Sequence, residues 1–290
     1  MNQRKESSGH WWVALVVVGL LLAGGYYWLF LREVPEPAPT AVSAPEAAPE
    51  PAPSASLPSA PAYPVAPEEA APDPAAKPLP GDARGAESYF SGELGRLLAG
   101  SPLLGWLHLD DFARRVVATV DNLPGRHVAP MVWPVQSTPE RLAVAEHDGK
   151  TTLDARNAER YRPLVQAFAA VDTARAVALY RRAYPLFQKA YEDLGYPGRY
   201  FNDRLVQVID HLLATPDLPD PIAVVLPPIN PADGASAPQR PWVRYEFADP
   251  TLEKLSSGQK IMLRMGAANR TVVKAKLREW RTAVTATAPR

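Results

Sequence analysis

Cysteine is absent from this chain of 290 residues. The absence excludes disulfides, a lipid-modified cysteine as membrane anchor, and a thiolate as nucleophile or metal ligand. It suits an oxidising compartment without requiring one, because a domain free of disulfides can occur in any compartment. Net charge is absent as well, since 31 Lys and Arg residues balance 31 Asp and Glu residues.

Short catalytic signatures are also missing. No serine lies in a G-x-S-x-G elbow, and the chain has neither a phosphate-binding loop nor a dinucleotide fingerprint. Four histidines, His108, His127, His147 and His211, lack the spacing of metal ligands. The sequence therefore predicts no cofactor, no metal and no enzymatic activity, although a catalytic site assembled from distant residues stays open.

Charge is missing from one long stretch, Trp11 to Leu31, which has 21 residues. As a helix rising about 1.5 Å per residue it spans about 30 Å, the hydrocarbon thickness of a bilayer. Trp12 and Trp28 lie near the two ends of the stretch, where amphipathic rings settle at the headgroup layers. We expect residues 11–31 to form a single transmembrane helix after a tail of residues 1–10.

A cleavable signal peptide is the alternative for this region. Arg4 and Lys5 form a basic segment, and Ala23-Gly24-Gly25 offers small residues for cleavage. The apolar stretch is longer than the usual h-region of about 7 to 15 residues, and bulky aromatic residues follow the small ones. The pattern therefore favours a retained signal-anchor.

The flanks of the stretch indicate its orientation. Arg4 and Lys5 precede it, whereas after Arg32 no basic residue appears until Lys77. The positive-inside rule then places the N-terminus in the cytoplasm. We expect an inner-membrane protein whose C-terminal domain lies in the periplasm.

Proline and alanine dominate the next segment, which we predict to be a disordered acidic linker over residues 32–85. Val34 to Pro80 contains 15 prolines and 14 alanines, with Tyr63 as its one aromatic residue. Such a composition cannot bury enough apolar surface to offset chain entropy. Fully extended, it reaches roughly 145 Å. A spacer is favoured over a low-complexity segment of unimportant length, and over a docking site for a proline-recognising partner.

Hydrophobic periodicity predicts a folded domain over residues 86–285, followed by a disordered tail of residues 286–290. Ser101-Pro102 and Asp172 are typical of helix starts. Pro163 is expected to interrupt or restart one helix, and Pro185 to kink or break another. The helical patterns cover 89–98, 109–120, 155–171, 173–194, 201–212 and 273–284.

Short strands accompany these helices. Asp148-Gly149 favours a tight turn between Leu142–Glu146 and Lys150–Leu153. The apolar runs Ile222–Leu226 and Trp242–Phe247 indicate one or two further strands. The predicted fold class is therefore mainly α (α+β), a compact helical domain with a short β-hairpin and extra short strands.

Long peptides of the domain resemble a known family. They are RRVVATVDNLPGR (Arg114–Arg126), ALYRRAYPLFQKAYEDLGYPGRYFNDRLVQVIDHLLATP (Ala178–Pro216) and YEFADPTLEKLSSGQKIMLRMG (Tyr245–Gly266). In motif and order the match covers about Gly95 to Ala283, and it resembles the proteobacterial family of domain of unknown function 3014. The resemblance implies an envelope protein with an N-terminal span and a soluble C-terminal domain. It supplies no activity, substrate or catalytic residue.

The first candidate binding cluster surrounds a Pro-Gly turn that enters a helix, where functional residues tend to gather. The alternative is structural, with a residue of the cluster capping the helix and an arginine pairing locally. The cluster consists of Tyr196, Arg199, Tyr200, Asn202, Asp203 and Arg204.

An aromatic stripe at helical spacing precedes this turn. Tyr180, Tyr184, Phe187 and Tyr191 share one side of the long helix, and such stripes are usually core. Further on, Asp203 and Asp210 lie about 10 Å apart along one helix face, an awkward separation for paired-carboxylate catalysis.

The second candidate is a basic stripe on the C-terminal helix. Arg270, Lys274, Arg278 and Arg281 lie beside its apolar face, and Lys276 lies on the other flank. A solvated helix face is the commonest explanation. Anionic lipid headgroups, cell-wall polymers, an acidic protein or the chain's own acidic linker are the alternatives. Nucleic acid fits the charge but not the expected compartment.

Anchor, linker and missing catalytic signatures together predict a binding, scaffold or adaptor role in the cell envelope. The rival hypothesis is a membrane-tethered periplasmic enzyme acting on a cell-wall or envelope polymer, with Asp203 among its candidate residues.

Overall fold

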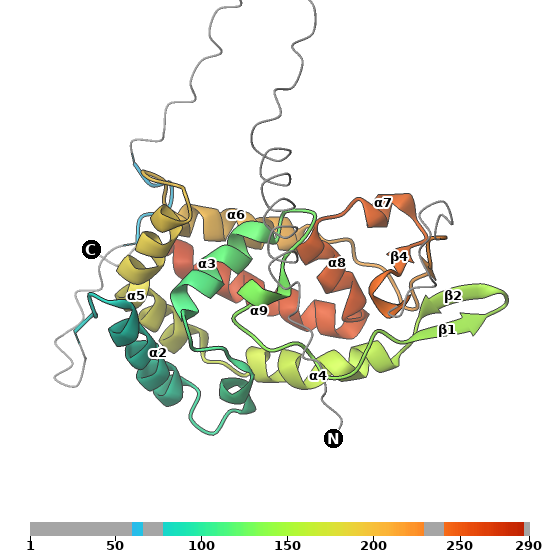
Figure 1. Cartoon of the computed structure of the whole chain (residues 1–290), viewed down its shortest axis with the longest axis horizontal. Coiled ribbons are helices and arrows are strands. Elements are labelled where there is room, and N and C mark those ends of the chain that lie inside the picture. The colour runs from blue at the N-terminus through green and yellow to red at the C-terminus, as the bar shows by residue number, and fades with distance from the viewer. Residues whose placement is uncertain (1–59, 66–77, 229–240, 287–290) are drawn as a thin grey trace, which may run out of the picture. The chain divides into compact units, whose positions relative to one another are not determined.

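The computed structural model describes residues 60–65, 78–228 and 241–286 (Figure 1). Helices predominate there, and the prediction of a mainly helical domain with small antiparallel hairpins is confirmed. The α-helices are α2 (Ala83–Leu97), α3 (Phe112–Asn122), α4 (Arg156–Ala169), α5 (Thr173–Asp193), α6 (Phe201–Leu213), α7 (Pro250–Glu253), α8 (Ser257–Arg264) and α9 (Ala267–Thr285). Short 3₁₀ helices are η2 (Pro102–Trp106), η3 (Pro130–Val132) and η5 (Pro241–Val243).

The predicted tail 1–10, transmembrane helix 11–31, most of the linker 32–85 and residues 287–290 lie outside these ranges. Among the residues that the structure does describe, no helix combines the length and apolarity needed to cross a bilayer. The membrane span therefore stays a prediction of the sequence.

Helix α5 forms the centre of the main hydrophobic core. Tyr180, Phe187 and Tyr191 are buried, and the rings of Tyr180 and Phe187 are 5.5 Å apart. Helices α2, α3, α6 and α9 all contact α5, and Phe90, Val117 and others from them join its cluster. The interpretation of the aromatic stripe as core is thus confirmed.

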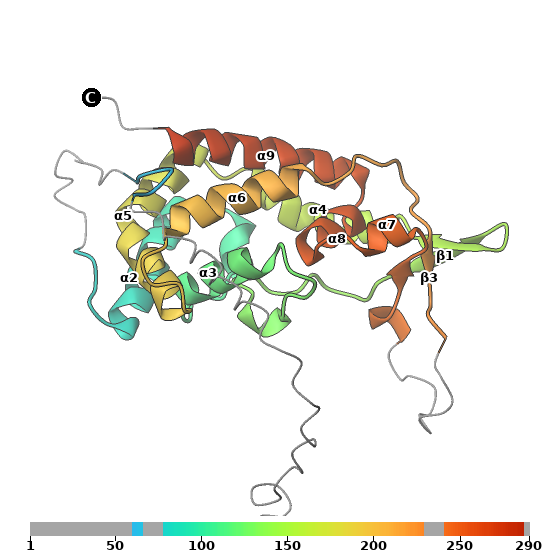
Figure 2. The same cartoon turned by 90° about the horizontal axis from the view of Figure 1, so that it is seen from above.

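Helix α9 connects this core to the rest of the domain. It packs against α4, α5 and α6, and Figure 2 shows it running beside α6. A second cluster, which includes Val165, Val208 and Met262, lies where α4, α6, α8 and α9 meet. The long C-terminal helix therefore contributes to several parts of one continuous helical body.

Two small antiparallel pairs complete the fold. Strands β1 (Val144–His147) and β2 (Lys150–Leu153) are joined at Asp148 and Gly149, whose φ angles of 49° and 73° are typical of a type I′ turn. The predicted hairpin is confirmed. Strands β3 (Val224–Val225) and β4 (Glu246–Phe247) pair within the two predicted apolar runs.

Proline does not divide the helices as the sequence suggested. Helix α4 continues through Pro163 and α5 through Pro185, so the expected interruption near Pro163 is wrong. A proline removes one backbone hydrogen bond, but residues on both sides of it pack into cores, including the fully buried Ala183 of α5. The start of α5 agrees with the sequence, because Asp172 accepts the Arg175 N–H at 2.8 Å.

The linker boundary needs two corrections. Helix α2 begins at Ala83, capped by Asp82, so helical structure starts before residue 86. Residues 60–65, within the segment predicted to be disordered, lie against the domain beside α6 (Figure 1). Tyr63 and Val65 pack on the main core. Side-chain partners on the domain explain the second difference, and they are described below.

Candidate functional site

The predicted turn cluster lies between α5 and α6 and borders a pocket of about 420 Å³. Asp121 of α3 and Tyr63 of the linker also line this pocket. Asn202 does not line it and is fully buried. The lining residues from the cluster are Tyr196, Arg199, Tyr200, Asp203 and Arg204. The structure therefore brings together most of the residues that the sequence selected.

Asp121 is the hub of the polar contacts on one wall. Its carboxylate accepts a hydrogen bond from the Tyr196 hydroxyl at 3.0 Å and from Nε of Arg204 at 2.8 Å. Arg204 also donates to the main-chain carbonyl of Asp121 at 2.8 Å. The hydrogen bond to Asp121 raises the pKa of Tyr196. These contacts join α3 to the start of α6, so Arg204 has a long-range partner in addition to its local hydrogen bond to Gln207 at 2.7 Å.

Aromatic rings form the other wall. The rings of Tyr191 and Tyr196 stack with centroids 4.7 Å apart, and the guanidinium carbon of Arg199 lies 5.9 Å from the Tyr196 ring centroid. Arg199 is exposed. A cation over an aromatic face at this distance is a weak attraction at an exposed site, about 0.5–1 kcal/mol. Arg199 is therefore accessible to a binding partner.

Helix α6 starts without a cap from its own turn. Tyr200 occupies the N-cap position and makes no side-chain cap, and Gln188 of α5 accepts the Phe201 N–H at 2.9 Å. The structural alternative for Asn202 or Asp203, that one of them caps the helix, is therefore wrong. Both side chains are directed to other partners.

Those partners are the main-chain groups of the linker segment. Asp203 accepts the N–H of Ala62 on Oδ2 at 2.9 Å and the N–H of Tyr63 on Oδ1 at 2.8 Å. Asn202 donates from Nδ2 to the carbonyl of Tyr63 at 2.9 Å, while its Oδ1 accepts the Tyr180 hydroxyl at 3.0 Å. Two adjacent side chains thus bind three main-chain groups of a short peptide. No pattern in the sequence indicated this contact.

The basic stripe is not a continuous exposed surface. Arg270 and Lys274 are only 2% and 4% exposed. Lys274 donates to the carbonyl of Thr215 at 2.6 Å and to Asp217 at 2.8 Å, and Arg270 donates to the carbonyl of Leu218. Long basic side chains bury their stems when a polar partner lies at the tip. The expectation that these two residues form an open binding face is wrong.

The remaining basic residues of α9 differ in their partners and in their exposure to solvent. Arg281 pairs with Asp210 of α6 through two hydrogen bonds, and this pairing raises its pKa. Lys276 is buried and donates to the carbonyl of Val171 at 2.6 Å. Arg278 is exposed. The basic surface of α9 that a partner can reach is therefore small.

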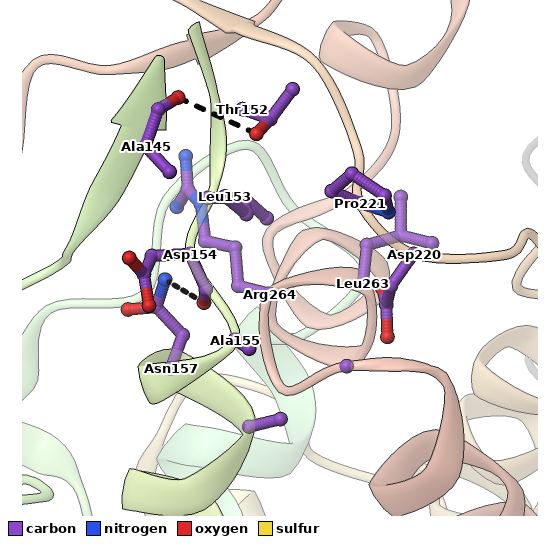
Figure 3. A pocket seen from close by; sticks show the side chains of 12 residues that line it. Ala145, Thr152, Leu153, Asp154, Ala155, Asn157, Asp220, Pro221, Leu263 and Arg264 are labelled. Atoms are coloured by element: carbon purple, nitrogen blue, oxygen red, sulfur yellow. Dashed lines mark hydrogen bonds between the residues drawn. The ribbon is translucent and has the colours of Figure 1, made fainter. Parts of the chain in front are cut away.

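A second pocket, of about 510 Å³, lies between strand β2, the start of α4 and the end of α8. In the view of Figure 3, Arg264 lies between Asp154 and Asp220. Arg264 donates to the carbonyl of Tyr245, and Asp220 accepts the N–H of Ala267 at 2.7 Å, at the start of α9. Sequence analysis did not select these carboxylates, because residues 154 and 220 are far apart in the chain.

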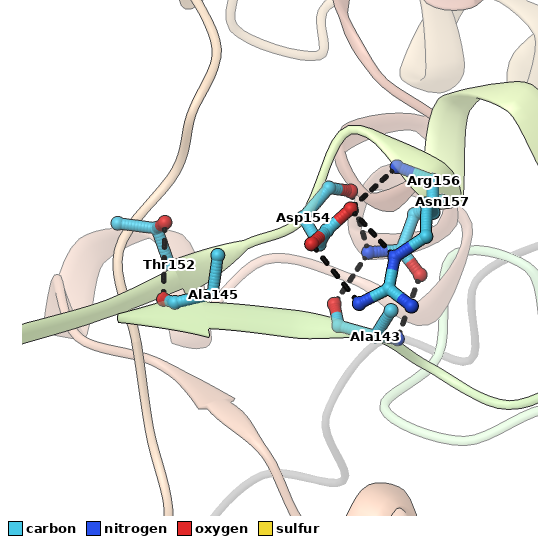
Figure 4. Close-up of polar contacts among 6 residues, drawn as sticks. All are labelled: Ala143, Ala145, Thr152, Asp154, Arg156 and Asn157. Atoms are coloured by element: carbon cyan, nitrogen blue, oxygen red, sulfur yellow. Dashed lines mark hydrogen bonds and ion pairs between the residues drawn. The ribbon is translucent and has the colours of Figure 1, made fainter. Parts of the chain in front are cut away.

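The polar groups beside this pocket hold the hairpin to α4, as Figure 4 shows. Asp154 accepts the Arg156 main-chain N–H at 2.8 Å and pairs with its guanidinium at 3.1 Å. This hydrogen bonding lowers the pKa of Asp154. The buried Asn157 bonds both the N–H and the carbonyl of Ala143. Asp154 is therefore held ionised, which does not suit a general acid.

A histidine and a serine also meet in the domain. Nε2 of His211 lies 2.8 Å from Oγ of Ser256. Ser256 is buried and caps α8, where its hydroxyl accepts the N–H of Gln259 at 3.2 Å. A nucleophile needs access to substrate, so the burial and the capping bond favour a structural role for this pair.

In the part of the chain that the structure describes, no three His, Asp or Glu side chains are grouped as metal ligands. A family model described as "Protein of unknown function (DUF3014)" matches residues 112–281. The chain belongs to this DUF3014 family. The match runs from α3 into α9 and includes the lining of both pockets except Ala62 and Tyr63, which lie before it. Searches of curated proteins and of solved structures found no match to this DUF3014 member.

Proposed function

We propose that this chain is a single-pass inner-membrane protein with its N-terminus in the cytoplasm and its DUF3014 domain in the periplasm. The domain binds an envelope protein or polymer and acts as a scaffold or adaptor. The uncharged stretch at residues 11–31, its basic N-terminal flank and the Pro/Ala-rich linker support the location.

The chemistry of the α5–α6 turn supports the binding role. Asp203 and Asn202 use their polar atoms on main-chain groups of residues 62 and 63. A side chain whose polar atoms bind main-chain groups acts as a recognition element. A general acid or base instead needs a polar atom that is not already bonded and that faces the substrate. Exposed Arg199 and the half-buried Tyr200 lie next to it and offer contacts to a partner.

An enzyme acting on an envelope polymer is the second candidate function. The pocket with Asp154 and Asp220 favours it, since glycoside hydrolysis uses two carboxyl groups. Its support is weaker because Arg156 lowers the pKa of Asp154 and Asp220 accepts a helix N–H. Replacement of Asp220 by Asn removes polymer cleavage if this function is correct.

Photo-crosslinking in cells tests the binding role. A photoreactive amino acid is placed at Arg199 or at Arg278, and at exposed Arg162 on α4 as the control position. We expect reproducible capture of one envelope protein or polymer from residue 199 or 278 and none from residue 162. Equal capture from all three positions, or from none, contradicts the proposal.

A further inference from the structure

The linker segment at residues 60–65 occupies the α5–α6 face without helix or strand structure of its own. Its sequence, Ala-Pro-Ala-Tyr-Pro-Val, carries no charge and includes Tyr63, the single aromatic residue of the predicted linker. Tyr63 and Val65 are half-buried on the main core, whereas Ala62 and Pro64 are exposed. Two side chains therefore face the domain, and the residue between them faces solvent.

One of the two receiving side chains, Asn202, also has partners within the helical domain. Asn202 is fully buried, held by the Tyr180 hydroxyl on Oδ1 and by a bond from Nδ2 to the carbonyl of Val284 at 3.3 Å. Asp203, next to it at the start of α6, presents both carboxylate oxygens. Hydrogen bonds to an ionised acceptor are stronger than neutral ones. An amide held by the domain, beside a carboxylate that accepts two main-chain N–H groups, is a site for peptide main chain.

Main-chain recognition does not depend on which chain supplies the peptide. The bonded groups are the N–H groups of residues 62 and 63 and the carbonyl of residue 63. Any peptide without proline at those two positions offers equivalent groups. Selectivity comes from the core surface on which Tyr63 packs and from Pro64, which needs no acceptor and restricts the preceding residue to non-helical conformations. The chemistry therefore selects a neutral peptide with an aromatic residue directly before proline.

We propose that Asn202 and Asp203 form a peptide-binding site that the chain's own residues 60–65 occupy in cis. A partner protein that carries a neutral Tyr-Pro segment displaces them. This inference rests on the proposed binding function and names the chemistry of the partner. The covalently attached segment competes at an effective concentration in the millimolar range, so only a matching partner segment displaces it.

Peptide binding to the full-length chain in detergent tests this site. The probe is a fluorescent peptide with the sequence of residues 58–67, and binding is followed by fluorescence anisotropy. Tyr63→Ala weakens the cis segment, so we expect this variant to bind the probe at least tenfold more tightly than the unaltered chain. Adding Asp203→Ala to that variant removes two charge-assisted hydrogen bonds, so we expect at least a tenfold loss of affinity.

Asp193→Ala on the Tyr63→Ala background is the matched control, because Asp193 is an exposed acidic residue at the end of α5 whose ion pair, among the residues described, is with Lys189. It leaves probe binding unchanged. Equal probe binding with and without Asp203, or no binding to the Tyr63→Ala chain, overturns the inference. Cellular crosslinking from residue 278 reports the proposed function separately, since it does not require the peptide site.

Discussion

The carboxylate of Asp203 accepts the main-chain N–H of Tyr63 at 2.8 Å, although the two residues are 140 positions apart. The bond joins the predicted linker to the start of α6, and Asp203 belongs to the first of the two residue groups that the sequence had selected as binding candidates. The DUF3014 domain therefore has a surface that holds a peptide, and the chain itself supplies the first example of what that surface accepts.

Gly266→Ala is expected to destabilise the domain. Gly266 has φ 88° and ψ 157°, a region populated essentially by glycine, and an added Cβ would lie 2.8 Å from the Cβ of Ala158. The backbone strain alone costs about 1–3 kcal/mol. Urea denaturation followed by circular dichroism measures the loss in free energy of unfolding.

Gly95→Ala is the control for that substitution. Gly95 lies within α2, and nothing lies within 4 Å of an added Cβ. Alanine favours a helix over glycine by about 1 kcal/mol, so we expect this variant to be slightly more stable than the unaltered chain. Equal effects of the two substitutions would contradict the special role of Gly266.

Asp121→Ala is expected to cost about 1.5–3 kcal/mol of stability, because it leaves Arg204 and the Tyr196 hydroxyl without their shared partner. Glu159→Ala removes an exposed pair with Arg162 and should change stability by less than about 1 kcal/mol. Urea midpoints of both variants give the comparison. If Glu159→Ala loses as much free energy of unfolding as Asp121→Ala, the contacts of Asp121 contribute no more to stability than an exposed ion pair does.

The stability of the domain should fall in mild acid because of His211. Burial lowers the pKa of His211 in the folded chain, and the Arg204 cation acts in the same direction. The unfolded chain binds a proton there near pH 6.5, so it gains more protons than the folded chain as the pH falls. The contribution of neutral His211 is present above about pH 6.5 and is lost below it.

His211→Gln is the variant that isolates this effect. Its free energy of unfolding, measured between about pH 8 and pH 5, should fall less than that of the unaltered chain. His127→Gln, at an exposed position, is the control and should follow the unaltered chain. A full acid-dependent loss in His211→Gln would assign the effect to other groups.

The orientation in the membrane can be tested with single cysteines, because the chain has none of its own. A cysteine at exposed Ala155 should react with a membrane-impermeant maleimide once the outer membrane is permeabilised. A cysteine at Ser7 should react only after the inner membrane is opened. The opposite pattern would reverse the proposed topology, and labelling of both residues before opening would contradict the cytoplasmic N-terminus.

Sequence patterns predicted the longer helices and the β1–β2 hairpin because both depend on local chemistry, whereas the short helices α7 and α8 were not predicted. The period of α5 and the Asp148-Gly149 turn are visible in a few neighbouring residues. The turn cluster was also found by local density of polar and aromatic residues. The contacts of its residues Tyr196 and Arg204 with Asp121 depend on the packing of α3 against α6. No short sequence pattern contains that information.

Two features were beyond sequence reasoning for physical reasons. Arg270 and Lys274 have the spacing of a solvated stripe, yet residues 215–218 bring carbonyl and carboxylate acceptors over them. Asp203 binds main-chain N–H groups, which every residue except proline has, so the contact leaves no signature in the linker. Long-range polar contacts of this kind follow only from the tertiary structure.

Amide hydrogen exchange at residues 60–65 of the full-length chain tests the central claim most directly. Pro61 and Pro64 have no N–H, so Ala62 and Tyr63 account for much of the signal. We predict that these two amides exchange at least tenfold more slowly in the unaltered chain and in Asp193→Ala than in Asp203→Ala. Equal exchange rates in all three proteins would contradict the peptide site at the start of α6.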